Sequence, residues 1–324
     1  MSKLPRLYVA LLRYRVAAMV MLFMLLGAAH DRALDLAAAH AFAALALASS
    51  YVAATALNDL ADEEIDRVNH PRDAGRPLVE GTATRRELGL LHVVAAALAL
   101  VAAVPLGWPG VAIVGVALAV SQAYSARPLR LSYRTAGAPP LLGVAYVLAP
   151  FSLGTVAAGD SVARIVSPFT AGLFCLFVAR IVLKDFRDRE GDALYGKPTI
   201  LLRFGKTVTC ALSLAFLLCG DLLLVSKLDL VLSVLLQPLV AAIGWMLWTL
   251  WGTEEPRSEQ VAIGIGARLG NGLLLSVLAW LTVDMNGASP AEAATIAGTV
   301  AGLVLFSSLA LAARADEVII GYKG

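Results

Sequence analysis

Residues 36–66 read LAAAHAFAALALASSYVAATALNDLADEEID, a long apolar run that ends in a cluster of aspartates. The apolar run extends from Leu36 to Leu57, and the cluster has the pattern Asp-x-x-Asp-x-x-x-Asp, formed by Asp59, Asp62 and Asp66. On a helix these spacings place the carboxylates on one face, where like charges repel unless a cation neutralises them. A divalent metal ion is the simplest cation for that position.

The same aspartate pattern occurs a second time, again directly after an apolar run. The second run extends from Ile165 to Leu183, and its aspartates are Asp185, Asp188 and Asp192. If both runs are membrane helices, both clusters lie at a membrane surface. The repeat is about four spans long, an even number, so both copies keep the same orientation and can approach each other across a central cavity.

The composition is typical of a membrane protein. Apolar residues make up 59% of the chain, whereas soluble domains contain roughly 45–50%. Runs close to the about 20 residues that cross a bilayer recur along the chain, and no linker or low-complexity segment separates two folding units. We therefore predict a single all-α, polytopic membrane domain over residues 1–324. The runs are Tyr8 to Ala29, Leu36 to Leu57, Leu88 to Leu106, Val111 to Tyr124, Leu141 to Ala158, Ile165 to Leu183, Val208 to Val225, Leu230 to Trp251, Leu269 to Val283 and Ala293 to Leu311.

The number of spans is predicted as nine or ten, because the fourth and ninth runs are short. The first run is interpreted as a retained helix and not as a cleaved signal peptide, since Arg13 and Arg15 lie in its opening half. Lys and Arg are concentrated in alternate connections, which the positive-inside rule assigns to the cytoplasm. The opposite connections hold only Arg32, Arg164 and Lys227. We therefore expect a multi-pass protein of the cell (inner) membrane with both Asp-rich loops on the cytoplasmic side.

Charge and cysteine usage exclude two other classes of function. The formal net charge is +2, too small to indicate a nucleic-acid partner, and the basic residues accompany membrane ends instead of forming a tail. Cys175, Cys210 and Cys219 all lie in apolar runs without metal-ligand spacing. The sequence therefore predicts no disulfide and no zinc site.

Carboxylates mixed with Lys and Arg on two facing loops suit a polyanionic ligand that arrives with Mg²⁺. Magnesium is held by one or two carboxylates while the phosphates of a substrate complete its shell, and a diphosphate fits that description. Ionising an allylic diphosphate requires stabilisation of the departing pyrophosphate by Mg²⁺, Arg and Lys. The carbocation must be shielded from water, and a bundle of membrane helices provides an apolar chamber with access for a lipid-soluble tail.

The motifs resemble the UbiA superfamily of intramembrane prenyltransferases. Asn58-Asp59-x-x-Asp62-x-x-x-Asp66, followed by Arg72 and Arg76-Pro77-Leu78, is similar to the first signature of the family. The second Asp pattern, with Gly196-Lys197, is similar to the second signature, and Tyr124-Ser125 with Arg130 resembles the stretch after the fourth span. The match covers residues 36–206. It implies an all-helical bundle of nine spans around a central cavity, a Mg²⁺-dependent site under cytoplasmic loops, and transfer of a prenyl group from its diphosphate to an acceptor.

The resemblance also assigns roles to individual residues. Residues expected to bind metal are Asn58, Asp59, Asp62, Asp66, Asp185, Asp188 and Asp192, of which Asp59, Asp62, Asp185 and Asp188 are expected to be catalytic. Residues expected to contact the diphosphate are Arg72, Arg130, Lys184 and Lys197. Arg180 is added from its position inside an apolar run before Asp185, where a charge is costly and faces a cavity or a partner; we expect it to reach the diphosphate or an aspartate.

Several alternatives remain open from the sequence alone. Aromatic acceptors are the commonest in the resembling family and are expected here, but members also alkylate lipid or sugar phosphates, and some cyclise the isoprenoid without an acceptor. A metal or organic-anion transporter is a non-enzyme alternative, although transport sites lie near the bilayer midplane on broken helices and these carboxylates map to loop ends. A structural scaffold, in which the aspartates are solvated helix ends, would leave the repeated pattern unexplained.

Overall fold

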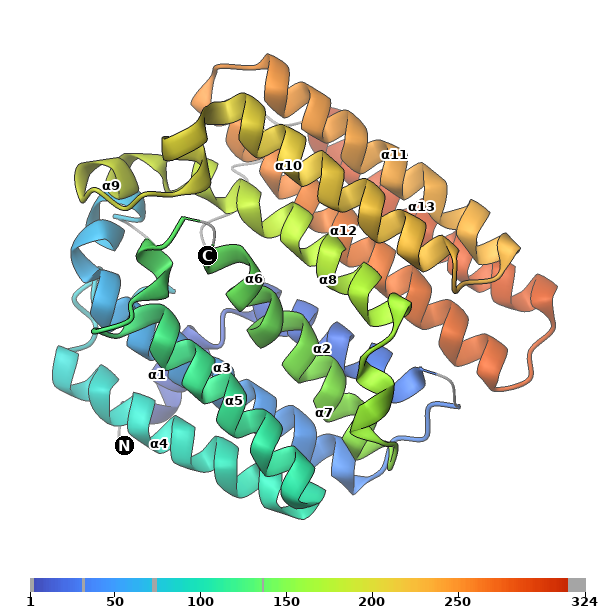
Figure 1. The fold of residues 1–324 in the computed structure, drawn as a ribbon, viewed down its shortest axis with the longest axis horizontal. Helices are drawn as coiled ribbons and strands as arrows, with labels where there is room; N and C mark the ends of the chain where they lie inside the picture. The colour runs from blue at the N-terminus through green and yellow to red at the C-terminus, as the bar shows by residue number, and fades with distance from the viewer. Residues whose placement is uncertain (1–2, 31–32, 72–74, 136, 314–324) are drawn as a thin grey trace.

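The structure is a computed structural model that describes residues 3–30, 33–71, 75–135 and 137–313. Within these ranges the regular elements are all helical, as the composition predicts. In Figure 1, α3, α4 and α5 lie together on one side, α10 to α13 on the other, and α2, α7 and α8 run between them. The α-helices are α1 Leu4–Leu11, α2 Tyr14–Ala29, α3 Ala38–Asn69, α4 Arg85–Ala103, α5 Gly107–Ser125, α6 Ala138–Gly143, α7 Ala149–Ala157, α8 Pro168–Ile181, α9 Arg189–Leu194, α10 Ile200–Val225, α11 Leu230–Gly252, α12 Pro256–Met285 and α13 Pro290–Ala313.

Short helical turns connect or interrupt several of these helices. A π-helical turn, η3 Val144–Leu148, joins α6 to α7, and a 3₁₀ turn, η5 Val182–Phe186, follows α8 and carries Asp185. The remaining 3₁₀ turns are η1 Val104–Leu106, η2 Leu131–Tyr133 and η4 Val162–Ile165. The interruption at η5 ends the apolar helix α8 just before the second Asp pattern.

The number of membrane spans is smaller than predicted when each helix is judged by length and hydropathy. Seven helical segments of the described chain qualify, or eight if the bent pair α1 and α2 counts as one span. One of these segments, Arg85–Ser125, contains both α4 and α5, which lie side by side in Figure 1. The helix α8 has 14 residues and is too short to qualify. The prediction of nine or ten spans is therefore not confirmed, while the all-helical architecture is.

The helix starts follow local sequence rules. In α4, the Thr84 side chain accepts a hydrogen bond from the backbone N–H of Glu87, and the Glu87 carboxylate accepts one from the Thr84 backbone, which is a capping box. Thr199 and Asp229 cap α10 and α11 in the same way with one side-chain bond each. Pro256 opens α12 thirteen residues before the predicted apolar run begins at Leu269. The amphipathic first turns of α12 explain why hydropathy alone misses its start.

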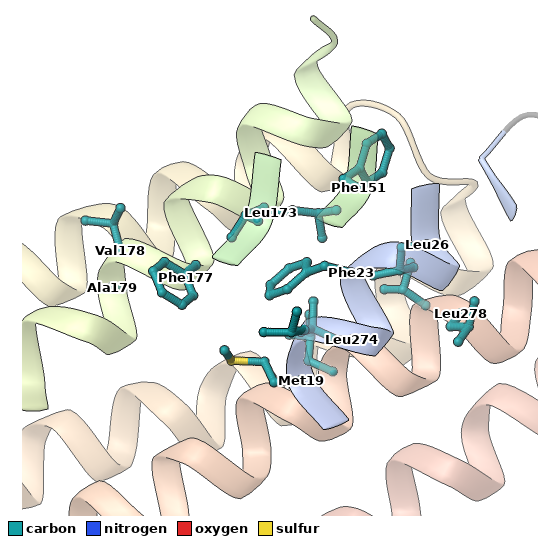
Figure 2. Close-up of a cluster of buried hydrophobic side chains, with 14 of the residues drawn as sticks. Met19, Phe23, Leu26, Phe151, Leu173, Phe177, Val178, Ala179, Leu274 and Leu278 are labelled. Carbon is teal, nitrogen blue, oxygen red and sulfur yellow. The ribbon is translucent and has the colours of Figure 1, made fainter. Parts of the chain in front are cut away.

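The apolar core surrounds α2, which lies between α8 and α12 (Figure 2). Phe23 of α2 and Phe177 of α8 meet edge to face with ring centroids 6.4 Å apart. Leu26 and Leu173 are fully buried in the same cluster. These buried contacts hold α2, α8 and α12 together.

The helices α2 and α7 cross with their backbones in contact. A Cβ atom on Gly154 would lie 1.8 Å from the Met24 carbonyl oxygen, and one on Gly27 would lie 2.0 Å from the Phe151 carbonyl oxygen. Only glycine fits at either position, because any side chain would require the helices to separate. Small residues at such crossings are typical of helix packing in membranes.

Candidate functional site

The first Asp pattern lies at a bend in α3. Asp62 has non-helical angles of φ −113° and ψ 17°, so the helix changes direction within the pattern. The Asn58 side-chain amide donates to Asp62 Oδ2 at 3.1 Å. From the turn after α5, Arg130 Nη2 donates to Asp62 Oδ1 and to the Ala61 carbonyl oxygen, both at 2.9 Å. Asp62 is thus held from its own helix and from a second segment.

Two further arginines neutralise the other carboxylates of this pattern. Arg13 donates to Asp59 Oδ1 at 2.7 Å, and Arg76 reaches the same oxygen at 3.4 Å. Arg76 also forms a hydrogen-bonded ion pair with Asp66. Asp59, Asp66 and Arg76 are all buried. The like charges that the sequence places on one helix face are therefore balanced by buried cations of the chain itself.

Among the described residues, positive φ angles outside glycine occur at Arg13 and Arg130, at 43° and 37°. This left-handed conformation costs about 1–3 kcal/mol for residues with a side chain and is found where the surroundings enforce it, notably at functional sites. Both arginines use it to direct a guanidinium at an aspartate of the first pattern.

The two Asp-rich segments meet. His70, at the end of α3, places Nε2 at 3.1 Å from Asp188 Oδ1. Next to it, the Asn69 side-chain oxygen accepts a hydrogen bond of 2.6 Å from the Gly191 backbone N–H. These contacts join positions that are more than a hundred residues apart in the chain.

A lysine lies between the two patterns. Lys197 Nζ is 3.2 Å from Asp192 of the second pattern and 3.9 Å from Asp62 of the first. Nearby, Lys184 donates to the Tyr124 hydroxyl at 2.9 Å. Carboxylates of both copies and two lysines therefore converge on one region.

This region opens onto a cavity of about 240 Å³. Apolar and aromatic side chains form its inner wall, with Tyr51 and Tyr146 rings 5.9 Å apart and Tyr146 and Phe177 rings 5.8 Å apart. The polar and charged residues that line it are Arg13, Ser50, Thr55, Asn58, Asp62, Asp66, Asn69, Arg76, Ser121, Ser125, Arg180, Lys184, Arg187, Asp188, Asp192 and Lys197. A charged opening above an apolar chamber is the arrangement that the sequence predicts.

The predicted site residues do not all line this cavity. Asp59 lies behind it, between Arg13 and Arg76, and Asp185 lines a small adjoining pocket. Arg130 reaches Asp62 without lining the cavity, and Arg72 lies outside the described residues. The predicted residues that do line it are Asn58, Asp62, Asp66, Arg180, Lys184, Asp188, Asp192 and Lys197.

Sequence reasoning missed several partners in the site. The sequence predicts Arg13 as part of a retained helix, and His70 lies beside Pro71 as a loop residue would, yet both contact aspartates. A charge inside an apolar run was a usable signal for Arg13. No comparable signal exists for His70, because its partner Asp188 lies in the other half of the repeat.

A buried glutamate holds the second Asp-rich segment from α12. Glu259 is 3% exposed and accepts hydrogen bonds from Arg189 at 2.8 Å and from Lys206 at 2.9 Å. Both cations also lie over the Phe186 ring, at 5.4 Å and 5.9 Å from its centroid. Phe186 follows Asp185 directly, so the glutamate fixes the cations that cover this segment.

The electrostatics of the second pattern differ between its members. Burial alone would raise the pKa of Asp188, but the Arg187 guanidinium and the His70 hydrogen bond hold that pKa well below its ordinary value. Burial raises the pKa of Asp185 to about 6, which the charge on Lys184 only partly offsets. Asp188 therefore stays ionised, whereas additional positive charge near Asp185 would favour the ionised form of that carboxyl.

The donor set fits a hard divalent cation in its chemistry. The site offers carboxylate and amide oxygens, the ligands that Mg²⁺ prefers, and Asp59 Oδ2 is buried without a hydrogen-bond partner. In the part of the chain that is described, however, no three His, Cys, Asp or Glu side chains are already gathered around one point. The carboxylates instead hold Arg and Lys, so a cation that arrives with an anionic ligand must exchange partners with them.

Comparison with known proteins places the chain in a family. The model of the UbiA prenyltransferase family matches residues 16–271. The chain belongs to the UbiA prenyltransferase family. It is therefore an enzyme of the prenyltransferase class, and the predicted resemblance to this family is confirmed.

Curated relatives of this UbiA family member include digeranylgeranylglyceryl phosphate synthases of archaea. The synthase of Natronomonas pharaonis is 28% identical over 207 residues, which cover 64% of this chain and 68% of the relative. That of Methanothermobacter thermautotrophicus is 29% identical over 171 residues, 52% of this chain and 57% of the relative. The alignments thus leave about a third to a half of each chain unmatched.

Solved structures share the fold of this UbiA family member at low identity. A structure described as digeranylgeranylglyceryl phosphate synthase in membranes has a TM-score of 0.65 at 17% identity, with 87% of this chain and 99% of that chain covered. A UbiA homolog from Archaeoglobus fulgidus, bound to GPP and Mg²⁺, has a TM-score of 0.59 at 18% identity, with 95% and 99% covered. These likenesses support the bundle described above.

Proposed function

We propose that this enzyme transfers a prenyl group from an isoprenyl diphosphate to an acceptor within the membrane, with Mg²⁺ as its cofactor. The observation that carries the proposal is the meeting of the two Asp-rich segments through His70, Asp188 and Lys197 above an apolar cavity. A charged headgroup and a hydrocarbon tail are thereby accommodated by one continuous space.

The residues proposed to hold Mg²⁺ are those of the two patterns that face the cavity, Asn58, Asp62, Asp66, Asp188 and Asp192, with Asp59 and Asp185 behind them. When bound, Mg²⁺ supplies positive charge that neutralises the departing pyrophosphate. The Mg²⁺ and GPP bound by the Archaeoglobus homolog support this assignment by family.

The cations of the chain bind and orient the diphosphate. Lys184 and Lys197 line the cavity and Arg130 adjoins it through Asp62; each of the three is held by an aspartate or by Tyr124. An incoming diphosphate offers Lys184 a stronger, charge-assisted hydrogen bond than the Tyr124 hydroxyl does, whereas for Lys197 and Arg130 it would replace one anionic partner by another. We expect Arg72 to join them, as the family motif implies.

The reaction breaks the bond between C1 of the prenyl group and the bridging oxygen, and the electron pair leaves with pyrophosphate. The resulting allylic cation faces the rings of Tyr51, Tyr146 and Phe177, whose faces carry partial negative charge. A nucleophilic atom of the acceptor then bonds to C1 and loses its proton to the released pyrophosphate. The apolar walls exclude water, which would otherwise capture the cation.

The acceptor is proposed to be a small aromatic compound or a membrane lipid. Aromatic acceptors follow from the family resemblance, whereas the named relatives make a glyceryl phosphate product, which indicates a lipid-type acceptor for them. Cyclisation without an acceptor is the second candidate activity. Membership of a transferase family removes the reason for proposing a transporter or a scaffold.

The chain is further proposed to span the cell (inner) membrane nine or ten times as one domain. Hydropathy counts α4 and α5 as one segment and does not count the short α8. Counting α4, α5 and α8 as separate spans supplies the additional ones. The positive-inside rule places the Asp-rich segments on the cytoplasmic side.

The decisive experiment incubates the purified enzyme with Mg²⁺ and labelled isoprenyl diphosphates of several lengths, with and without aromatic and lipid acceptors. Product that contains both donor and acceptor supports transfer. Release of pyrophosphate without acceptor, together with a cyclic hydrocarbon, would instead establish cyclisation. An enzyme that consumes no diphosphate in any mixture would refute both activities.

A further inference from the structure

A further cavity, separate from the Asp-rich site, lies between α11, α12 and α13. Its volume is about 330 Å³. Among the described residues, none lines both this cavity and the main one. The three helices lie on the side of the bundle away from α3, α4 and α5 (Figure 1). We call this cavity the α12 groove, and the proposed transfer reaction makes no use of it.

One end of the α12 groove is polar. Glu255, Arg257 and Ser258 line it where α12 begins. The Glu255 carboxylate accepts a hydrogen bond of 2.6 Å from the Ser258 hydroxyl. Glu259, the next residue, pairs with Arg189 at the start of α9. The polar end of the groove therefore lies on the same side of the bundle as the Asp-rich segments.

The rest of the α12 groove is mostly apolar. Its lining residues include Ile265 and Leu269 of α12 and Leu305 and Leu309 of α13. Twelve residues separate Arg257 from Leu269 within α12, which corresponds to about 18 Å along the helix axis. Inside a membrane, an open apolar space of this length is filled by lipid hydrocarbon, because the bilayer core contains no water.

Tryptophan side chains mark the depth of the polar end. Trp245 lines the groove and is 72% exposed, and Trp248 and Trp251 are exposed further along α11. Tryptophan is enriched at membrane–water interfaces, at the level of the lipid headgroups. Since α11 ends at Gly252 and α12 begins at Pro256, the polar end lies beside these tryptophans. It is therefore at headgroup level, and the apolar part extends into the hydrocarbon.

The polar end carries one charge of each sign. Arg257 has five N–H donors, so it accommodates a phosphate alongside a partner within the chain. The Glu255 carboxylate has acceptor capacity beyond its bond to Ser258, and it attracts an ammonium group while repelling an anion. An anionic lipid complements the arginine alone, whereas a zwitterionic lipid complements both charges.

On these grounds we propose that the α12 groove binds a zwitterionic phospholipid with a primary ammonium group, a phosphatidylethanolamine. Its phosphate pairs with Arg257, its ammonium donates to Glu255, and its acyl chain lies along α12 and α13. The trimethylammonium of phosphatidylcholine has no N–H to donate, and phosphatidylglycerol has no cation for Glu255. The groove therefore selects among lipid headgroups.

The test uses the full chain in phosphatidylcholine nanodiscs that contain a trace of photoreactive lipid. The probes are phosphatidylethanolamine, phosphatidylcholine and phosphatidylglycerol with the same diazirine acyl chain, and peptide mass spectrometry maps the crosslinks. In the wild type, we expect crosslinks at Leu269 and Leu305. Their yield should be about fivefold higher with phosphatidylethanolamine than with the other probes, the effect of one charged contact near a membrane surface.

Each charge has its own expected effect. Glu255→Gln should lower the yield with phosphatidylethanolamine to that with phosphatidylcholine, because the ammonium loses its partner. Arg257→Gln should lower the yield about fivefold with all three probes, because each carries a phosphate. The matched control is Arg203→Gln. Arg203 is exposed near the start of α10, lies over the Phe204 ring and does not line the groove, so this variant should match the wild type.

A larger side chain at Ala312 tests the acyl-chain site without a change of charge. Ala312 of α13 lines the groove and is exposed, so Ala312→Phe fills the space without entering the core. It should lower the yield with all three probes, while an unchanged unfolding midpoint in phosphatidylcholine nanodiscs shows that the variant is folded.

Three results would overturn the proposal. They are equal yields of the three probes in the wild type, a higher yield with phosphatidylglycerol than with phosphatidylethanolamine, and an unchanged yield with phosphatidylethanolamine in Glu255→Gln. Absence of crosslinks in the groove with every probe would overturn it as well. None of these measurements requires turnover, so the outcome is independent of the proposed transferase function.

Discussion

Replacing Glu259 by leucine is predicted to destabilise the protein and to weaken the second Asp-rich segment. Glu259 is 3% exposed and is paired with Arg189 and Lys206. Removing one partner of a fully buried ion pair costs about 3–5 kcal/mol, because the remaining charge is left uncompensated. The Arg189 side chain is 42% exposed and the Lys206 side chain 20% exposed, so both can partly recover hydration, and we expect about 2–3 kcal/mol.

The loss should also reach the active site, since Arg189 and Lys206 lie over Phe186 beside Asp185. Without their common anion the two cations repel each other, and the segment from Asp185 to Asp192 loses its anchor on α12. We expect a several-fold higher Mg²⁺ concentration for half-maximal rate, with a smaller change in the maximal rate.

The measurement combines thermal unfolding of the detergent-solubilised protein with initial rates across a Mg²⁺ titration. At about 2 °C for each kcal/mol in a large domain, the midpoint should fall by about 5 °C. Glu190→Gln is the control, because Glu190 is exposed and adjoins Arg189 without a described bond to it. A Glu259→Leu protein that unfolds at the wild-type temperature and needs no more Mg²⁺ for half-maximal rate would refute the reasoning.

Three further predictions follow from the site and the helix crossing. Asp62→Ala and Asp188→Ala should each abolish nearly all turnover while the protein stays folded in detergent; wild-type rates would discard their catalytic assignment. Burial raises the pKa of Asp185 from 3.8 to about 6, so ionisation of this carboxyl destabilises the folded, metal-free protein. The free energy of unfolding therefore falls as the pH rises from about 4 to about 6 and stays lower above that. Asp185→Asn should therefore raise the free energy of unfolding of the metal-free protein at pH 8 by up to about 3 kcal/mol for a shift of this size, and this gain should vanish at pH 4; a gain equal at both pH values would contradict the pKa argument. Gly154→Ala should destabilise strongly because its Cβ meets backbone, whereas Gly89→Ala, with no neighbour within 4 Å, should not; equal melting of the two variants would show that α2 and α7 can separate freely.

The sequence predicts the helical class and the two Asp patterns because both appear in the local periodicity of the chain. Hydropathy identifies apolar runs, and the repeated spacing identifies carboxylates that must be neutralised together. It does not reveal which cations do so. Arg13 and Asp59 are 46 residues apart, and His70 and Asp188 are 118 residues apart. Such pairs are set by how helices pack, which no single segment encodes.

The roles within the patterns also depend on packing. The bend at Asp62 turns that side chain to the cavity while Asp59, one turn earlier, faces Arg13 and Arg76. Arg180, which the sequence predicts to reach a diphosphate or an aspartate, lines the cavity and also donates a hydrogen bond to Asn271, across a helix contact that spacing cannot predict. The start of α12 was missed because its first turns are polar, although Pro256 is a usual first residue of a helix.

The glycine crossing of α2 and α7 has a consequence for altering the chain length of the product. Since no side chain separates the two backbones at Gly27 and Gly154, rotamer changes cannot alter the distance between α2 and α7, and this crossing is fixed. Gly266 of α12 is different, because it lines a small apolar cavity between α2, α8, α10, α11 and α12, and an added Cβ there would meet only the flexible end of Met246. Engineering for longer or shorter prenyl donors should therefore begin on α12, where volume can be exchanged one methyl group at a time.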